Sequence, residues 1–264
     1  MERARVENTS GASSAPKGVS PSGASFDRAG LSLDGIEVPS LPPLASSSVQ
    51  LTEVHASEFV RRLRLGDGAA DDYVQDLLQR GATVESVYLD LLAPAARILG
   101  TLWEDDRCDF VEVTLVLGRI QRFVHSISPM FLPRKPAEEI VGRALLACVP
   151  NEQHSLGIFI VAEFLLRAGW AVSLTPPASG RSNLVDQVRS EWFDVVGFSV
   201  ACDSHLALIK REIGDVRRHS RNRRIGILVG GRTFNDHPEL VHRVGADASA
   251  GNAREAALVA AKLL

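Results

Sequence analysis

Residues 152–157 combine a carboxylate, an imidazole and a glycine directly after an apolar run. Glu152 precedes His154 by two positions, Gly157 follows it by three, and residues 144–149 supply a run typical of a β-strand. A carboxylate beside an imidazole can accept the proton of one ring nitrogen and leave the other free for a metal. The pattern predicts His154 as a metal ligand and Glu152 as its orienting acceptor. For these six residues alone, an ordinary loop or helix-capping histidine is the simpler interpretation.

Two further signals follow later apolar runs. Ser199 lies near the end of the strand-like stretch at residues 194–200. There are 41 residues between Gly157 and Ser199, and Ala201 comes two positions after Ser199. Gly230 and Gly231 end the stretch at 225–229. Three chemically distinct signals at the ends of three successive strands form a more specific pattern than any one of them.

This spacing resembles the cobalamin-binding domain family, whose pattern is an acidic residue, x, His, x, x, Gly, followed by Ser-x-Leu and Gly-Gly. The likeness covers about residues 142–264, with Ala201 in place of the family's Leu. It implies that His154 is the lower axial ligand of cobalt and that Glu152 orients its ring. It also implies that a slot for the displaced nucleotide tail is lined by Gly157, Ser199, Ala201, Gly230 and Gly231.

The organisation of residues 142–264 is consistent with this resemblance, because strand-like and helix-like stretches alternate. Such alternation predicts an α/β fold with a flavodoxin-like, doubly wound parallel sheet and a ligand crevice at the carboxyl ends of its strands. The expected strands are 143–149, 170–175, 194–200, 225–229 and 246–250, and the expected helices are 154–167, 181–191, 204–219, 238–244 and 252–263.

Upstream, the apolar spacing in residues 49–131 is helical and predicts a bundle of four or five helices. Residues 132–141, with Pro133 and Pro136, are interpreted as a linker, to which Pro129 is also assigned. Residues 1–48 are rich in Ser, Gly, Pro and Ala and predict a disordered leader.

Composition restricts the classes of function. A net charge of −3 with 45% apolar residues argues against a dedicated nucleic-acid-binding protein. Three scattered cysteines do not make a disulfide framework or a zinc site. No apolar run is long enough for a transmembrane helix or a signal peptide, so a cytoplasmic protein without a membrane contact is expected. The basic residues from Arg217 to Arg224 are interpreted as a solvated face, with contact to an acidic partner as the alternative.

Two more segments are candidates for contact with the ligand. Regulators with this bundle-plus-binding-domain arrangement carry a Trp over the upper corrin face, and Trp103 resembles it; a core anchor is the equal alternative. Their Glu-His pair corresponds here to Val113 and Thr114, so that second protein ligand is missing. The segment 203–205 (Asp-Ser-His) either contacts corrin amides or caps the next helix.

Residues 102–264 most resemble the AerR/PpaA antirepressors of purple photosynthetic bacteria, notably in residues 150–157, 167–170 and 191–197. The resemblance implies a light-responsive antirepressor that binds cobalamin and a CrtJ/PpsR-type repressor protein, without specific nucleic-acid binding of its own.

Two alternatives use the same domain. One is a haem or redox sensor, with His154 on iron and Cys202 near it. The other is a corrinoid methyl carrier. No nucleophile–base–orienter set, phosphate loop or carboxylate pair stands out, so a protein that is not an enzyme is expected.

Overall fold

The computed structural model describes residues 49–66, 68–133, 139–148, 156–175 and 180–264, with the side chains of 180–182 excepted. All of them belong to one compact unit, Val38–Leu264. The predicted leader 1–48 and the predicted ligand pair Glu152 and His154 lie outside the described residues.

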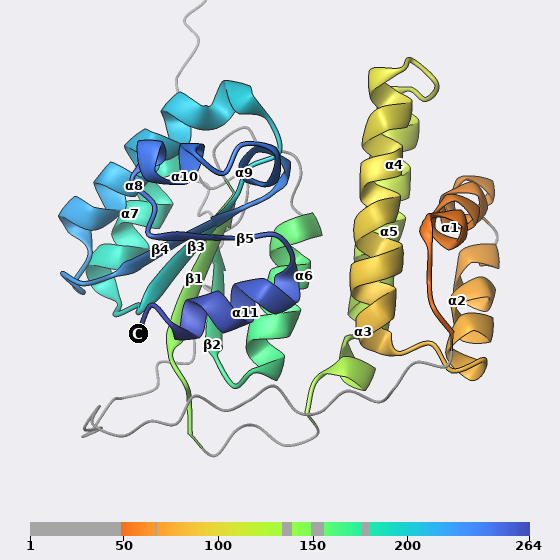
Figure 1. Ribbon diagram of the computed structural model, residues 1–264, viewed down its shortest axis with the longest axis horizontal. Helices are drawn as coiled ribbons and strands as arrows, with labels where there is room; N and C mark the ends of the chain where they lie inside the picture. The colour runs from red at the N-terminus through yellow and green to blue at the C-terminus, as the bar shows by residue number, and fades with distance from the viewer. Residues whose placement is uncertain (1–48, 67, 134–138, 149–155, 176–179) are drawn as a thin grey trace, which may run out of the picture. The chain divides into compact units, whose positions relative to one another are not determined.

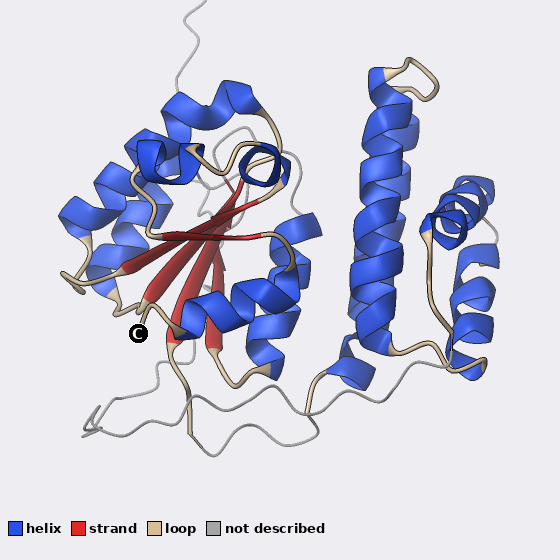
Figure 2. Cartoon of the chain, in the orientation of Figure 1, coloured by secondary structure: helices blue, strands red, loops and turns tan. Residues whose placement is uncertain are grey.

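Residues 143–250 contain a five-stranded sheet whose strand pairs are all parallel (Figures 1 and 2). The strand order β2-β1-β3-β4-β5 is the flavodoxin-like doubly wound order, which confirms the predicted fold class. The strands are β1 Arg143–Cys148, β2 Ala171–Thr175, β3 Val195–Ser199, β4 Gly226–Gly230 and β5 Ala248–Ala250.

Helices cover both faces of this sheet, which is why its central strands β1, β3 and β4 are mainly apolar and buried. Alternate residues of β1 enter two different cores: Leu146 packs towards α6 (Leu156–Arg167) and α11 (Ala253–Ala261), whereas Leu145 lies in the second core. That second core is shared with α7 (Gly180–Ser190), α8 (Leu206–His219) and α10 (Leu240–Val244).

The sequence prediction missed two short elements in this domain. The predicted helix 204–219 begins instead as a single 3₁₀ turn, η2 Asp203–His205, before α8. Helix α9, Arg232–Asp236, starts directly after Gly231, where the prediction had a loop. Five residues are too few for a helical period to be visible in the sequence, which explains the omission.

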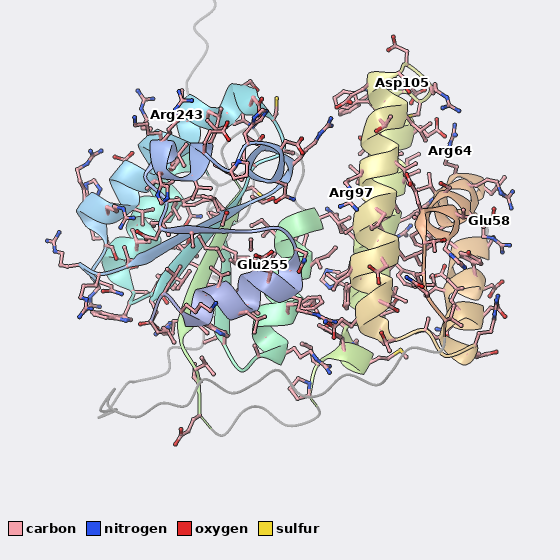
Figure 3. All side chains as sticks on the ribbon, in the orientation of Figure 1. Glu58, Arg64, Arg97, Asp105, Arg243 and Glu255 are labelled. Carbon is pink, nitrogen blue, oxygen red and sulfur yellow. The ribbon has the colours of Figure 1, made fainter. Side chains whose placement is uncertain are left out.

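The amino-terminal helices form four helical segments, the lower of the two predicted numbers. They are α1 Glu53–Leu65, α2 Ala69–Gln79, a continuous segment Val84–Glu104 made of α3 (Val84–Ser86), η1 (Val87–Leu92) and α4 (Ala93–Glu104), and α5 Phe110–Phe131. Fully buried Phe59, Leu77, Leu91 and Ile120 contribute one side chain from each segment to a common core. Arg64, labelled in Figure 3, hydrogen-bonds Glu112 and ties α1 to α5.

Proline explains one irregularity and corrects one prediction. The segment η1 is a π-helix in which the amide of Ala93 reaches back to the carbonyl of Tyr88. It lies directly before Pro94, which has no amide hydrogen to continue the α-helical ladder. The assignment of Pro129 to the linker was wrong, because Pro129 lies inside α5, in its last turn.

The bundle core is continuous with the core under α6 and α11. The rings of Tyr88 and Phe164 each pack on Phe131, at centroid distances of 4.9 and 4.8 Å. The Tyr88 hydroxyl lies 3.4 Å from a carboxylate oxygen of Glu163. Burial, and next the negative charge of Glu163, raise the pKa of Tyr88 above its ordinary value. Aromatic packing across α5 and α6 therefore joins the two sets of helices.

Candidate functional site

Three strand ends meet at the carboxyl edge of the sheet. The last residue of β1, Cys148, pairs in register with Ser199 of β3, and Ser199 pairs with Gly230 of β4. The chain order reverses between β1 and β3, and ligands of doubly wound sheets bind outside the carboxyl ends of the strands at such a switch point. The segment carrying Glu152 and His154 connects β1 to α6, so its ends are fixed at this edge.

The wall of the site between α6 and β3 is tight at Gly157, on the side that faces Ser199. A Cβ at this position would lie 3.3 Å from the Oγ of Ser199, a tighter separation than is usual. Gly157 is the second residue of α6, and the half-buried Ser199 ends β3. The structure thus brings together two predicted site residues that are far apart in sequence. A glycine backbone beside a hydroxyl is a surface that a bulky planar group can approach closely, and in this respect the described residues fit a corrinoid tail.

The Gly230-Gly231 pair has a structural cause of its own. Gly231 adopts φ +99°, and a Cβ there would overlap the carbonyl of Val200. A Cβ at Gly230 would lie 3.2 Å from the carbonyl oxygen of Ala250. Backbone packing therefore requires glycine at 231 and favours it at 230, and the contact of both glycines with a ligand stays a prediction.

The residues after β3 follow the same edge. Ala201 is half-buried, and Asp203 and Ser204 are exposed within η2. Neither η2 nor α8 has a side-chain cap hydrogen bond, so the alternative capping role of residues 203–205 finds no support. Cys202 is exposed, with its Sγ 2.9 Å from the Oγ of Ser204.

Trp103 lies at the end of α4 and is 45% exposed, so it is not the fully buried anchor that a core role would require. The next residue, Glu104, is 3.3 Å from the guanidinium of Arg232, which directly follows Gly231. This ion pair places the Trp103 end of α4 beside the carboxyl edge of β4. Sequence reasoning missed Arg232, although its position after the glycine pair was a usable signal.

Helix α5 contributes a second exposed aromatic residue at the same end of the bundle. His125 of α5 lies against Phe159 of α6, and Arg167 of α6 lies over Phe131 of α5, so the two helices run side by side in the same direction. On this alignment the first turns of α5 lie beyond the first turn of α6. They carry Phe110, which is 58% exposed and was missed in the sequence, together with Val113 and Thr114.

The metal ligand itself remains a prediction, because His154 and Glu152 are outside the described residues. Among the residues that the structure describes, no group of three or more His, Cys, Asp or Glu side chains is placed to hold a metal ion. In the same residues no helix is both long and apolar enough to cross a membrane.

Comparisons with known proteins agree with this geometry. Residues 142–261 match the B12 binding domain family. An uncharacterized 20.5 kDa protein in the bchF-crtJ intergenic region of Rhodobacter capsulatus is 27% identical over 164 residues, which are 62% of this chain and 84% of that protein.

Among solved structures, the monomethylamine corrinoid protein of Methanosarcina barkeri aligns with 80% of this chain and 99% of its own, with a TM-score of 0.67 and 17% identity. That likeness concerns the fold alone. The matched residues contain the whole sheet and every strand end described above. Residues 142–261 are therefore similar to the B12 binding domain family, over somewhat less than half of the chain.

Proposed function

We propose that this protein is a cobalamin-binding, light-responsive antirepressor that binds a CrtJ/PpsR-type repressor of photosynthesis genes and modulates its DNA binding. One observation carries the cobalamin part: Ser199 and Gly157 lie in contact distance at the switch point where the segment with His154 begins. The described members of the spaced motifs, Gly157, Ser199 and Gly230, support this part because they lie at one edge of the sheet.

Each residue has a distinct task in this proposal. His154 would hold the metal, and Glu152 would accept a hydrogen bond from the other ring nitrogen and hold the ring in one orientation. Gly157 and Ser199 form the wall against which the nucleotide tail lies, with Gly230 and Gly231 at its far side. Trp103 covers the opposite face. Bound cobalamin would supply a metal whose upper ligand is exchangeable and, when bonded through carbon, photolabile.

The regulatory part draws on the relative from Rhodobacter capsulatus, whose gene lies between bchF and crtJ. The aligned 164 residues exceed the B12-binding domain, so the likeness extends into the helical bundle. A ligand change at the carboxyl edge would bias the contact between this domain and the bundle, as a two-state switch requires. In this proposal the protein is not an enzyme, and its output is protein binding.

The first test measures ultraviolet–visible spectra after gel filtration of protein mixed with hydroxocobalamin. Wild-type protein is expected to retain the corrinoid, His154→Ala to lose it, and His242→Ala, an exposed histidine on α10, to behave as wild type. Retention by His154→Ala would contradict the assigned ligand. A parallel sample with haem tests the sensor alternative, in which haem alone would be retained.

The second test adds the repressor. Protein loaded with adenosylcobalamin is kept dark or illuminated, and repressor binding is measured by co-purification and by the mobility of repressor–operator complexes. The proposal expects a light-dependent difference that His154→Ala abolishes. Methyl transfer from methylcobalamin to a thiol or folate, without repressor binding, would instead support a methyl carrier.

A further inference from the structure

The exposed charges of α8 and the loop after it all have one sign. Between Leu206 and Ile225 the sequence contains seven Lys and Arg residues and two acidic residues. Both acidic side chains face inward, since Glu212 is 0% and Asp215 is 7% exposed. The basic face of α8 is defined by the exposed side chains, namely Lys210, Arg211, Arg217, Arg218, Arg221, Arg223 and Arg224.

Most of these side chains are not paired with a carboxylate among the described ion pairs. Arg217 is paired with Asp247, and Arg218 with Asp215. For the other five, no carboxylate partner is found among the described ion pairs. Arg221 and Arg223 donate instead to backbone carbonyls, of Ser190 and Arg218, which holds them in place without neutralising them.

The face is extended, and it is separate from the corrinoid site. From Lys210 to Arg218 the helix rises about 12 Å, and the loop continues the array towards the start of β4. That loop lies at the amino edge of the sheet, opposite the carboxyl edge that carries Ser199 and Gly230. Figure 3 shows side chains with nitrogen tips on this side of the domain, including Arg243 on α10, the helix packed against α8.

A scarcity of exposed apolar groups favours one class of partner. Among the described residues from Leu206 to Ile225, no large hydrophobic side chain is strongly exposed, although Trp192, which is 38% exposed, follows Ser190 by two residues, and the Ser190 carbonyl accepts a hydrogen bond from Arg221. Stable protein–protein interfaces depend on a cluster of aromatic or aliphatic anchors, and one half-exposed ring beside the face does not make such a cluster. A row of guanidinium groups suits phosphates, because the planar fork donates two parallel hydrogen bonds. Nucleic-acid backbones present such phosphates in series and need no apolar contact.

We propose that the basic face of α8 binds the phosphate backbone of duplex DNA without sequence preference. This contact goes beyond the proposed function and does not depend on repressor or corrinoid. The overall charge of −3 is compatible with it, because the field at a surface is set by local charges within a Debye length. A regulator that acts on a DNA-bound protein would gain affinity from such a second contact.

The test measures fluorescence anisotropy of a labelled duplex of arbitrary sequence against the full chain at several salt concentrations. Wild-type protein is expected to bind at low salt with a steep salt dependence. The triple variant Arg221→Gln/Arg223→Gln/Arg224→Gln should bind about tenfold more weakly or worse and lower the salt slope by about 2 to 3. The matched control Arg107→Gln/Arg122→Gln/Lys262→Gln removes the same charge from exposed positions elsewhere and should leave binding close to wild type.

Other results would overturn the inference. These are no binding by the wild type at low salt, an equal loss in both triple variants, or equally tight binding of polyglutamate, which would identify an acidic protein as the partner. If the loop variant misfolds by circular dichroism, Lys210→Gln/Arg211→Gln provides the same test from the middle of α8. Hydroxocobalamin retention, measured in parallel, reports on the proposed function alone.

Discussion

Replacing Gly157 with alanine separates a binding role from a structural one. The added methyl group would lie 3.3 Å from the Oγ of Ser199, so the hydroxyl must yield by a few tenths of an ångström. The higher helix propensity of alanine opposes this strain. It stabilises a helix by up to about 1 kcal/mol relative to glycine, and by less in the first turn, where Gly157 lies in α6. The two effects nearly cancel, and the free energy of unfolding should change by less than about 1 kcal/mol.

Corrinoid affinity should respond much more. A methyl group placed on the wall of a close-fitting site costs about 1–3 kcal/mol, which corresponds to a roughly tenfold to hundredfold weaker complex. The assay is a titration of Gly157→Ala with hydroxocobalamin followed by absorbance, beside a urea unfolding curve of the same variant without ligand. The expected result is weaker binding at nearly unchanged stability.

Two other glycines serve as controls. A Cβ at Gly118 in α5 meets nothing within 4 Å, so Gly118→Ala should raise stability by about 1 kcal/mol and leave binding unchanged. Gly231→Ala should lower stability by about 2–4 kcal/mol, because φ is +99° and the Val200 carbonyl occupies the space. Wild-type affinity in Gly157→Ala would refute the assignment of this wall to the site, and unfolding of that variant would show that the glycine is structural.

Three further predictions concern the packing between the helices. Phe164→Ala should cost about 3–5 kcal/mol in urea unfolding, because the ring is 1% exposed and packs on Phe131; a loss under about 1 kcal/mol would contradict the continuous core. Burial raises the pKa of Tyr88, so the folded state keeps the phenol neutral and stability should fall as pH rises above 10.0. Tyrosinate absorbance from Tyr88 should therefore appear only together with the loss of circular dichroism. Arg254→Met leaves the buried carboxylate of Glu85 without its ion pair and should lower the free energy of unfolding by about 1–3 kcal/mol. Adding Glu85→Gln to this variant should restore part of that loss. Equal stability of the single and double variants would argue against the ion pair.

The centre of the sheet could be predicted from the sequence because each central strand is a short apolar run between polar turns. Burial on both faces imposes that pattern: four of the six residues of β1, and four of the five residues in each of β3 and β4, are buried. The edge on which the site lies followed from the same reasoning, since parallel strands bring their carboxyl ends together. The contact of Gly157 with Ser199 was implied by this topology, although its distance was not.

Local packing of backbone and side chains decided the features that the sequence analysis misinterpreted. The glycine pair at 230–231 was interpreted as room for a ligand, yet the structure gives it a cause in the backbone of Val200 and Ala250. Sequence periodicity cannot distinguish these cases, because a close approach of two backbones leaves no pattern in side-chain types. Pro129 was misplaced for a related reason: proline disfavours a helix interior, but the packing of Phe131 keeps the last turn of α5 helical.

Helix α6 explains how a local event at the carboxyl edge can reach the bundle. Its second residue, Gly157, is a predicted site residue, and Phe159 and Phe164 contact α5 and η1 over the next two turns. Close-packed aromatic side chains have few alternative arrangements, so a shift of the first turn cannot be absorbed locally and must move the contact with Phe131 or break it. The sequence carried no sign of this coupling, because α6 is apolar on nearly all sides and its period does not tell which residues face the sheet and which face the bundle. In a helix that is apolar on nearly all sides, only the folded structure shows which residues contact the sheet and which contact the bundle.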